Sequence, residues 1–285
     1  MRAPLGPVPD PARTRAEPMP DPARGVFETL LARDGRVQAL EAHLARLSCA
    51  VSDLYDAALP PQLAERARGA ARGRSGSHRL RVDARPDSGA LEIELQLTRL
   101  DGGGAGREVG CRPVVVPGGV GKYKWADRRL LESLADPGAV ALILDRGDEV
   151  LEAAWANCWL IEGNALITPA ADGRLLPGVT RQLLLDLAPS LGLQAHTEPI
   201  SLARARAADA IFLTSSLRHA VPAELEPGPS RSGDDSLMHP RSRPRDASLV
   251  HAIRAALAQT AWDNDRLRRA SPGGQLWRFG STPRN

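Results

Sequence analysis

The amino-acid sequence predicts an α+β fold in two parts: a small N-terminal α/β domain over 25–117 and a larger domain over 118–225 with a barrel-like β core. Strands alternate with amphipathic helices in the first part. The second part is a run of short apolar strands closed by tight turns, which favours antiparallel pairing and barrel closure. Hydrophobic residues make up 42% of the 285 residues, so a core can form and a wholly disordered chain is excluded.

The N-terminal part begins with two apolar runs joined by Asp34-Gly35, so GVFETLLARDGRV (25–37) is expected to form a hairpin. A helix is expected from Leu40 to Tyr55, because apolar residues recur on one of its faces. The pattern then predicts, in order, a helix over 61–73, a hairpin of 78–85 with 90–100, and a strand over 111–117.

The second part is expected to open with a helix over 127–134. A strong helix is also predicted over 175–192, which Pro177-Gly178 enters, Thr180 can cap and Gly192 ends. The remaining pattern predicts strands over 139–145, 149–155, 157–163 and 164–169, then LQAHTEPI (193–200), a short helix over 201–207 and two apolar runs over 208–216 and 220–225.

Two flanking segments, 1–24 and 226–246, are expected to be disordered, because they offer little apolar surface to bury. The Arg- and Gly-rich residues 263–285 are expected to form a flexible tail. The sequence ASLVHAIRAALAQTAW has helical spacing, so a C-terminal helix is expected over 247–262, with Ser248 able to cap it. The net charge of +3 arises in these flanks, and aromatic residues are not interleaved with the arginines. No nucleic-acid partner is therefore expected.

The composition argues against several other classes of protein. No stretch approaches 18 uncharged apolar residues, so no membrane span is expected, and the Pro-rich N-terminus lacks the apolar core of a secretory signal. The three cysteines, Cys49, Cys111 and Cys158, are widely spaced, which is typical of buried thiols in a cytoplasmic protein. The six histidines form no paired motif, so no metal site is expected.

Lys122 and Lys124 are the only lysines among 37 basic residues. In a chain that otherwise uses arginine, a retained lysine indicates chemistry that arginine cannot perform. A desolvated amine can lose its proton and attack a carbonyl to form a Schiff base, whereas arginine stays protonated. The alternative is a solvated surface charge, and the residues alone leave both interpretations open.

Glu152 is a second candidate, because it is an acid within the apolar run EVLEAAW. Burying a carboxylate without a partner is costly, so a buried Glu152 needs a positively charged partner such as a protonated pyridine ring. The alternative is that Glu152 lies on an edge strand and faces water.

Two short segments could bind an anion. LPGVT (176–180) opens the predicted helix, where backbone N–H groups and the helix dipole favour phosphate. Ser215 and Ser216 follow Thr214 at the end of a predicted strand, which places three hydroxyls in a row. Arg46 lies on the helix predicted over 40–55 and could equally be a surface charge.

These features occur together, and the chain resembles the class IV aminotransferase family. The matching segments keep the family's order: GVFETLLARDGRVQALEAHLARL (25–47), KWADRRL (124–130), ALILDRGDEVLEAAWANCWLIEGNALITP (141–169), LLPGVTRQLLLDLA (175–188) and ADAIFLTSSLRHAVPAEL (208–225). The resemblance implies the two-domain fold of that family, pyridoxal 5'-phosphate (PLP) as cofactor, and a homodimer with active sites near the interface.

The resemblance also implies roles for individual residues. Lys124 keeps the family's spacing to Asp127-Arg128 and matches the lysine that binds PLP covalently and then acts as acid and base, whereas Lys122 does not keep that spacing. Glu152 matches the acid that pairs with the pyridine nitrogen. The contacts to the cofactor phosphate fall on Arg46, Val179, Thr180, Ser215 and Ser216.

Within the family, FETLLARDGRV and EAHLARL are most similar to the aminodeoxychorismate lyases. This implies elimination of pyruvate from 4-amino-4-deoxychorismate, a small-molecule amine, to give 4-aminobenzoate for folate biosynthesis. The alternatives are an aminotransferase acting on branched-chain or D-amino acids and a non-catalytic binding protein of the same fold. The chain departs from the family at Asp127, where Asn is common, and in the Pro-rich arm that replaces the usual first strand.

Overall fold

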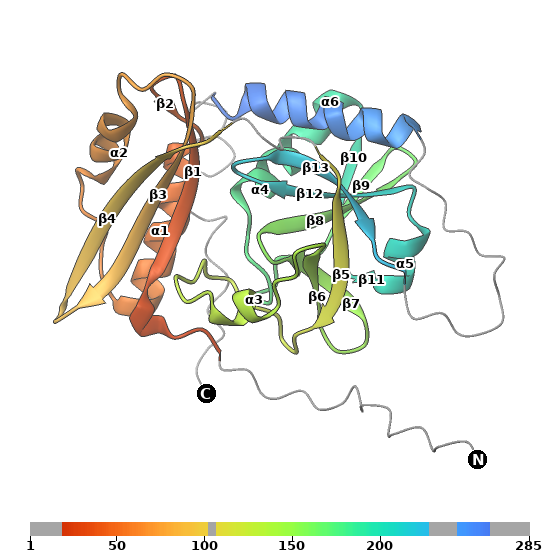
Figure 1. Cartoon of the computed structure of the whole chain (residues 1–285), viewed down its shortest axis with the longest axis horizontal. Coiled ribbons are helices and arrows are strands. Elements are labelled where there is room, and N and C mark those ends of the chain that lie inside the picture. The colour runs from red at the N-terminus through yellow and green to blue at the C-terminus, as the bar shows by residue number, and fades with distance from the viewer. Residues whose placement is uncertain (1–18, 102–106, 228–243, 263–285) are drawn as a thin grey trace, which may run out of the picture.

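The computed structural model describes residues 19–101, 107–227 and 244–262 and has a mixed α/β fold. A four-stranded sheet with two helices lies beside a β-barrel that carries further helices (Figure 1). No helix in these described ranges is long and apolar enough to span a membrane. The disorder expected over 1–18 and 228–243 and the flexible tail expected over 263–285 concern residues outside the described ones.

The N-terminal sheet has the strand order β2-β1-β3-β4 and is antiparallel throughout. Its strands are β1 (Val26–Arg33), β2 (Arg36–Val37), β3 (Ser77–Asp87) and β4 (Ala90–Arg99). Both expected hairpins are confirmed. Their two-residue turns, Asp34-Gly35 and Ser88-Gly89, have positive φ at both positions, which matches the right-handed twist of the strands they join.

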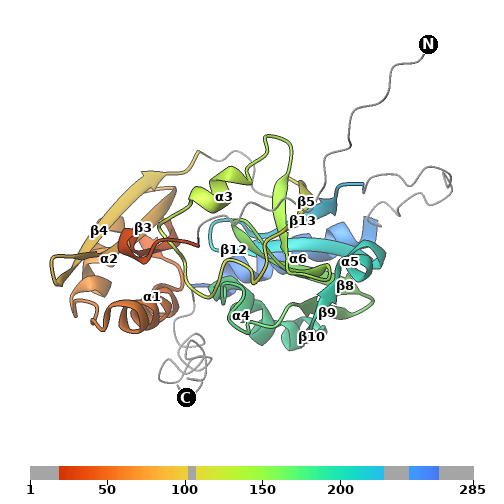
Figure 2. The same ribbon diagram turned by 90° about the horizontal axis from the view of Figure 1, so that it is seen from below.

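Helices α1 (Leu40–Tyr55) and α2 (Leu63–Ala71) cover one face of this sheet. The apolar stripe of α1 includes Leu47 and Val51, both fully buried against strand residues such as Leu30 and Leu80. The opposite face of the sheet is turned toward the barrel (Figure 2). Both helices confirm the pattern expected from the apolar periodicity.

The barrel consists of six strands in the closed order β5-β6-β7-β8-β12-β13, because β8 pairs with both β7 and β12 and β5 pairs with β13. These are β5 (Val109–Val115), β6 (Val140–Leu144), β7 (Glu149–Ala153), β8 (Ala156–Glu162), β12 (Ala210–Ser215) and β13 (His219–Leu225). The barrel-like core and the antiparallel pairing of β6, β7 and β8 are confirmed. Strands β9 (Ala165–Thr168), β10 (Gln194–Thr197) and β11 (Ile200–Ser201) extend the sheet.

Strand β5 lies in the barrel, where it runs parallel to both β6 and β13. The N-terminal sheet therefore ends at Arg99, and a boundary at residue 117 is too late. Parallel neighbours need long connections rather than hairpins, so no local turn signal fixed the place of this strand.

The helix expected over 175–192 begins later, because α4 spans Val179–Leu187 and a short 3-10 helix (Ala188–Leu191) continues it to Gly192. Gly178 is the N-cap, so the expectation that Thr180 caps this helix is wrong. Leu176 precedes a proline and is therefore biased toward extended backbone. The other helices of this part are α3 (Arg129–Ser133) and α5 (Leu202–Ala207).

Helix α6 (Pro244–Thr260) runs along the barrel and reaches the N-terminal sheet (Figure 1). Its Ile253 and Leu257 are fully buried in the cluster that contains Trp159 and Phe212. Just past its end, the carbonyl of Ala261 accepts a hydrogen bond from Ala39 N–H at 3.1 Å, which ties the two parts together. The helix begins before residue 247, with a proline in its first turn, so Ser248 is not its cap.

Residues 19–24 are part of the ordered structure, so the expectation of disorder up to residue 24 is wrong for them. Pro22–Arg24 form a 3-10 helix, which the Asp21 carboxylate caps by accepting a hydrogen bond from Ala23 N–H. Two long-range hydrogen bonds anchor this segment: Tyr55 Oη donates to Pro22 O, and Asp21 N–H donates to Asp127. These contacts were not visible in the local composition.

Candidate active site

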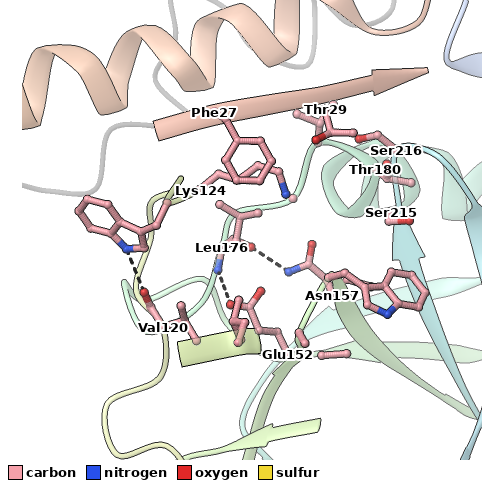
Figure 3. Close-up of a pocket in the computed structure, with 18 of the residues that line it drawn as sticks. Phe27, Thr29, Val120, Lys124, Glu152, Asn157, Leu176, Thr180, Ser215 and Ser216 are labelled. Atoms are coloured by element: carbon pink, nitrogen blue, oxygen red, sulfur yellow. Dashed lines mark hydrogen bonds between the residues drawn. The ribbon is translucent and has the colours of Figure 1, made fainter. Parts of the chain in front are cut away.

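A cavity of about 350 Å³ lies between the N-terminal sheet and the barrel (Figure 3). This volume is within the range of small-molecule sites. All seven residues that the sequence singled out for a cofactor site line it: Arg46, Lys124, Glu152, Val179, Thr180, Ser215 and Ser216. They come from α1, the segment before α3, β7, the start of α4 and the end of β12.

Lys124 lies in the segment between β5 and α3, and its backbone is fixed against β1. Phe27 N–H donates to the Lys124 carbonyl at 2.9 Å, and Trp125 bridges Val26. The amine of Lys124 points into the cavity beside the Phe27 ring, with Nζ 4.8 Å from the ring centre (Figure 3). Burial, assisted by the charges of Arg46 and Arg128, lowers the pKa of Lys124 to about 8. The unprotonated fraction of this amine near neutral pH is therefore much larger than that of an ordinary lysine.

Lys122 is directed elsewhere, although it lies only two residues away. Its Nζ donates to Asp53 Oδ2 at 2.9 Å, and it does not line the cavity. Burial alone would lower the pKa of Lys122, but the contacts with Asp53 and Tyr123 outweigh this effect and raise it. Lys122 is thus held as a protonated ion-pair partner.

Glu152 lies on β7 and is 7% exposed, so the alternative that it faces water on an edge strand is wrong. Leu176 N–H donates to its Oε1 at 3.2 Å (Figure 3). Burial raises the pKa of Glu152 to about 8, although Leu176 N–H and the charge of Lys124 act in the opposite direction. The carboxyl group is therefore poised to ionise when a further positive charge approaches.

The start of α4 forms one end of the cavity, together with the hydroxyls of Thr180, Ser215 and Ser216 (Figure 3). The first N–H groups of a helix have no acceptor within it, so they can bind an anion. A Cβ added to Gly178 would lie 1.8 Å from Asn157 Oδ1, so this position requires glycine. Asn157 Nδ2 also donates to Leu176 O at 2.8 Å and so fixes the segment that enters α4.

Arg46 is held in a buried network that sequence reasoning did not find. Its Nε and Nη2 donate to the two carboxylate oxygens of Glu28, each at 2.7 Å, and Nη1 donates to Pro177 O at 2.8 Å. His43 Nδ1 also contacts Glu28 at 2.7 Å, and its Nε2 lies 3.1 Å from Ser216 Oγ. Arg46 therefore fixes the approach to α4 through Pro177.

The charge state of this network follows from its burial. Burial alone would raise the pKa of Glu28, but the charges of Arg46 and His43 outweigh it and lower the pKa to about 2. Burial lowers the pKa of His43, despite the Glu28 carboxylate that raises it. One sequence signal was available: His43 and Arg46 are three residues apart and therefore share a helix face, which α1 turns inward.

Asp127 lines the cavity, but its carboxylate is already occupied. It accepts hydrogen bonds from Arg129 Nε and Nη2 and from Asp21 N–H. The hydrogen bonds from Arg129 hold the pKa of Asp127 well below its usual range. The described residues contain no group of three side chains suited to hold a metal ion.

Residues 120–225 match the family model of amino-transferase class IV. A D-alanine aminotransferase of Listeria monocytogenes is 34% identical over 84 residues, which are 30% of this chain and 29% of that relative. The matched part of the chain thus spans less than a third of the length of these curated relatives.

The structural similarity extends over most of the chain. A hypothetical aminotransferase from Mycobacterium tuberculosis, solved in a PLP-bound form, has a TM-score of 0.70 at 22% identity and covers 93% of this chain and 95% of its own. A candidate 4-amino-4-deoxychorismate lyase from Legionella pneumophila has a TM-score of 0.67 at 18% identity, with 86% and 97% covered. The chain therefore has the class IV aminotransferase fold, and its residues 120–225 match the model of that family.

Proposed function

We propose that the chain is a PLP-dependent enzyme in which Lys124 binds the cofactor covalently. The proposal rests on one cavity that combines three features suited to three parts of PLP. They are a lysine amine of lowered pKa, a buried acid and a helix start able to bind an anion. Lys124 could bond to the aldehyde of PLP, and Glu152 could pair with its ring nitrogen. The start of α4, with Thr180, Ser215 and Ser216, could bind its phosphate. PLP supplies an electron sink that stabilises negative charge at the substrate carbon.

The residues of the chain perform the remaining work. Lys124 would hold and move a proton at the substrate carbon, because its lowered pKa suits both acceptance and donation near neutral pH. Glu152 would hold the ring nitrogen of the cofactor, and its ionised carboxylate would favour the protonated form of that nitrogen. Leu176 N–H orients one carboxylate oxygen and leaves the other available for this contact.

The reaction we propose is elimination of pyruvate from 4-amino-4-deoxychorismate to give 4-aminobenzoate, a precursor for folate biosynthesis. The similarity of FETLLARDGRV and EAHLARL to the aminodeoxychorismate lyases supports this reaction. Incubating the PLP-loaded protein with aminodeoxychorismate and no amino acceptor should yield 4-aminobenzoate and pyruvate in equal amounts. Failure to form 4-aminobenzoate with correctly loaded protein would refute the lyase assignment.

An aminotransferase is the second candidate, because the curated relative from Listeria monocytogenes is a D-alanine aminotransferase. It would use the same Lys124 and Glu152, with a branched-chain or D-amino acid as donor. Formation of pyruvate from D-alanine, only when 2-oxoglutarate is added, would favour it over the lyase. We further propose a homodimer, which light scattering at active concentrations tests directly. Failure to bind PLP would instead favour the third candidate, a non-catalytic binding protein of the same fold.

A further inference from the structure

Three arginines of the cavity lining have no acidic partner. In the described part of the chain, no carboxylate lies within 4.0 Å of Arg79, Arg128 or Arg218. The other two arginines of the lining differ, because Arg46 is held by Glu28 and Arg81 donates to both carboxylate oxygens of Asp83 at 2.6 Å. The cavity thus keeps three guanidinium groups that form no ion pair within 4.0 Å in the described part of the chain.

Arg128 and Arg218 are brought together by the turn between β7 and β8. Arg128 Nη2 donates to the carbonyl of Ala154 at 2.9 Å. The guanidinium carbon of Arg218 lies 4.8 Å from the ring centre of Trp155, the next residue of the same turn. Arg128 and Arg218, from distant segments, therefore contact two consecutive residues of this turn. These residues lie two and three positions after Glu152 in the sequence.

Arg79 reaches the same cavity from β3 of the N-terminal sheet. Its Nε is buried and has no hydrogen-bond partner among the described residues. A buried donor without an acceptor is unfavourable unless a ligand supplies one. The acids that remain in the lining do not fill this role, since Asp127 is occupied by Arg129 and Glu152 by Leu176.

We propose that Arg79, Arg128 and Arg218 form a second anion subsite, which binds substrate carboxylates away from the reacting amine. This inference rests on the proposed function. Guanidinium groups bind carboxylates through paired, charge-assisted hydrogen bonds, and three of them suit more than one carboxylate. The substrate class is therefore an amine that carries two carboxylates. Arg112 and Arg181 do not line the cavity and have no part in this subsite.

The test compares two probes that cannot react, benzene-1,3-dicarboxylate and benzoate, on the PLP-loaded protein by calorimetry. A charge-assisted hydrogen bond is worth enough to change a dissociation constant by about 10- to 100-fold. The dicarboxylate should therefore bind at least about tenfold more tightly than benzoate, and this preference should shrink as salt is added. Equal dissociation constants for the two probes in the wild-type protein would overturn the proposal.

Variants assign the preference to the arginines. Arg128→Met and Arg218→Met should each reduce the preference by about tenfold or more, whereas Arg218→Lys should keep part of it. Arg112→Met, an arginine outside the cavity, is the matched control and should leave the preference unchanged. Arg128→Met removes the hydrogen bond to the Ala154 carbonyl and could therefore prevent folding. In that case the Arg218 variants decide the test, because Arg218 is exposed and its replacement does not disturb the core.

The outcome is separable from the proposed function, because PLP attachment is measured by absorbance before any probe is added. Protein that fails to take up PLP would refute the proposed function. Protein that takes up PLP normally but binds both probes alike would refute only the second anion subsite. A loss of PLP affinity in Arg218→Met, with the preference intact, would assign Arg218 to the cofactor phosphate instead and overturn the proposal.

Discussion

The substitution Glu152→Gln should make the PLP-free protein more stable at pH 8, although it removes a residue of the site. Burial raises the pKa of Glu152 from 4.5 to about 8. The native state therefore binds more protons than the unfolded state between these values, and the free energy of unfolding falls as the pH rises through this window. Each pH unit between these two pKa values lowers the free energy of unfolding by about 1.4 kcal/mol. The buried Glu152 therefore lowers the free energy of unfolding by up to about 5 kcal/mol at pH 8.

Glutamine removes this charge and can still accept the hydrogen bond from Leu176 N–H. Its additional amide donor would need a new acceptor, and a buried donor left without one costs about 1–3 kcal/mol. The net expectation is a gain of about 2–4 kcal/mol at pH 8 and no gain at pH 5, where the wild-type carboxyl is mostly protonated. Lys124, whose pKa is lowered to about 8, makes stability rise between pH 8 and 10.5, so the comparison stays at or below pH 8.

The assay is urea unfolding of PLP-free wild type and variant at pH 5, 6, 7 and 8, followed by tryptophan fluorescence. Glu224→Gln, an exposed position on β13, is the matched control and should change the free energy of unfolding by less than about 0.5 kcal/mol. The same Glu152→Gln protein should lose most of its activity with PLP. A stability difference that is equal at pH 5 and pH 8 would refute the reasoning, because the cost would then not come from ionisation.

Two further substitutions test the supports of the site. Glu28→Gln leaves the buried Arg46 without its carboxylate and should cost about 3–5 kcal/mol in urea unfolding at pH 7. The wild-type contribution of this pair is present above pH 4.5 and is lost as the pH falls toward about 2, so a difference that persists at pH 2 would contradict the assignment. Gly178→Ala places a Cβ 1.8 Å from Asn157 Oδ1 and should cost about 1–3 kcal/mol and weaken PLP binding in a fluorescence titration. Gly69→Ala in α2, where a Cβ meets nothing within 4 Å, is its control and should stabilise by about 0.5–1 kcal/mol; equal effects at both glycines would show that the Asn157 contact is unimportant.

Local patterns predicted most of the secondary structure, because hairpin turns and apolar periodicity depend on neighbouring residues. Asp34-Gly35 fixed one hairpin in this way. The membership of β5 in the barrel was not predictable, since its partners β6 and β13 are joined to it through long connections. The position of the α4 start was also missed, because it depends on Asn157, which lies about 20 residues earlier in the chain.

In the candidate site, too, some residues were predictable from the local sequence and others were set by long-range packing. Lys124 and Glu152 stood out from the sequence, since one is a rare residue type here and the other an acid in an apolar run. Glu28 did not stand out, because the sequence does not show whether a single acidic residue in a strand is buried or exposed. Only the packing of α1 on β1 brings Arg46 to it, across 18 positions of sequence. The resemblance to the family, rather than spacing alone, indicated which lysine enters the cavity.

The central claim, that Lys124 binds PLP covalently, is tested most directly by reductive trapping. The protein is incubated with PLP, reduced with borohydride, digested and examined by mass spectrometry for the modified peptide. The structure predicts the label on Lys124, its loss in Lys124→Ala and its persistence in Lys122→Ala, because only Lys124 points into the cavity. A label on Lys122, or covalent PLP that survives at the site in Lys124→Ala, would contradict the account.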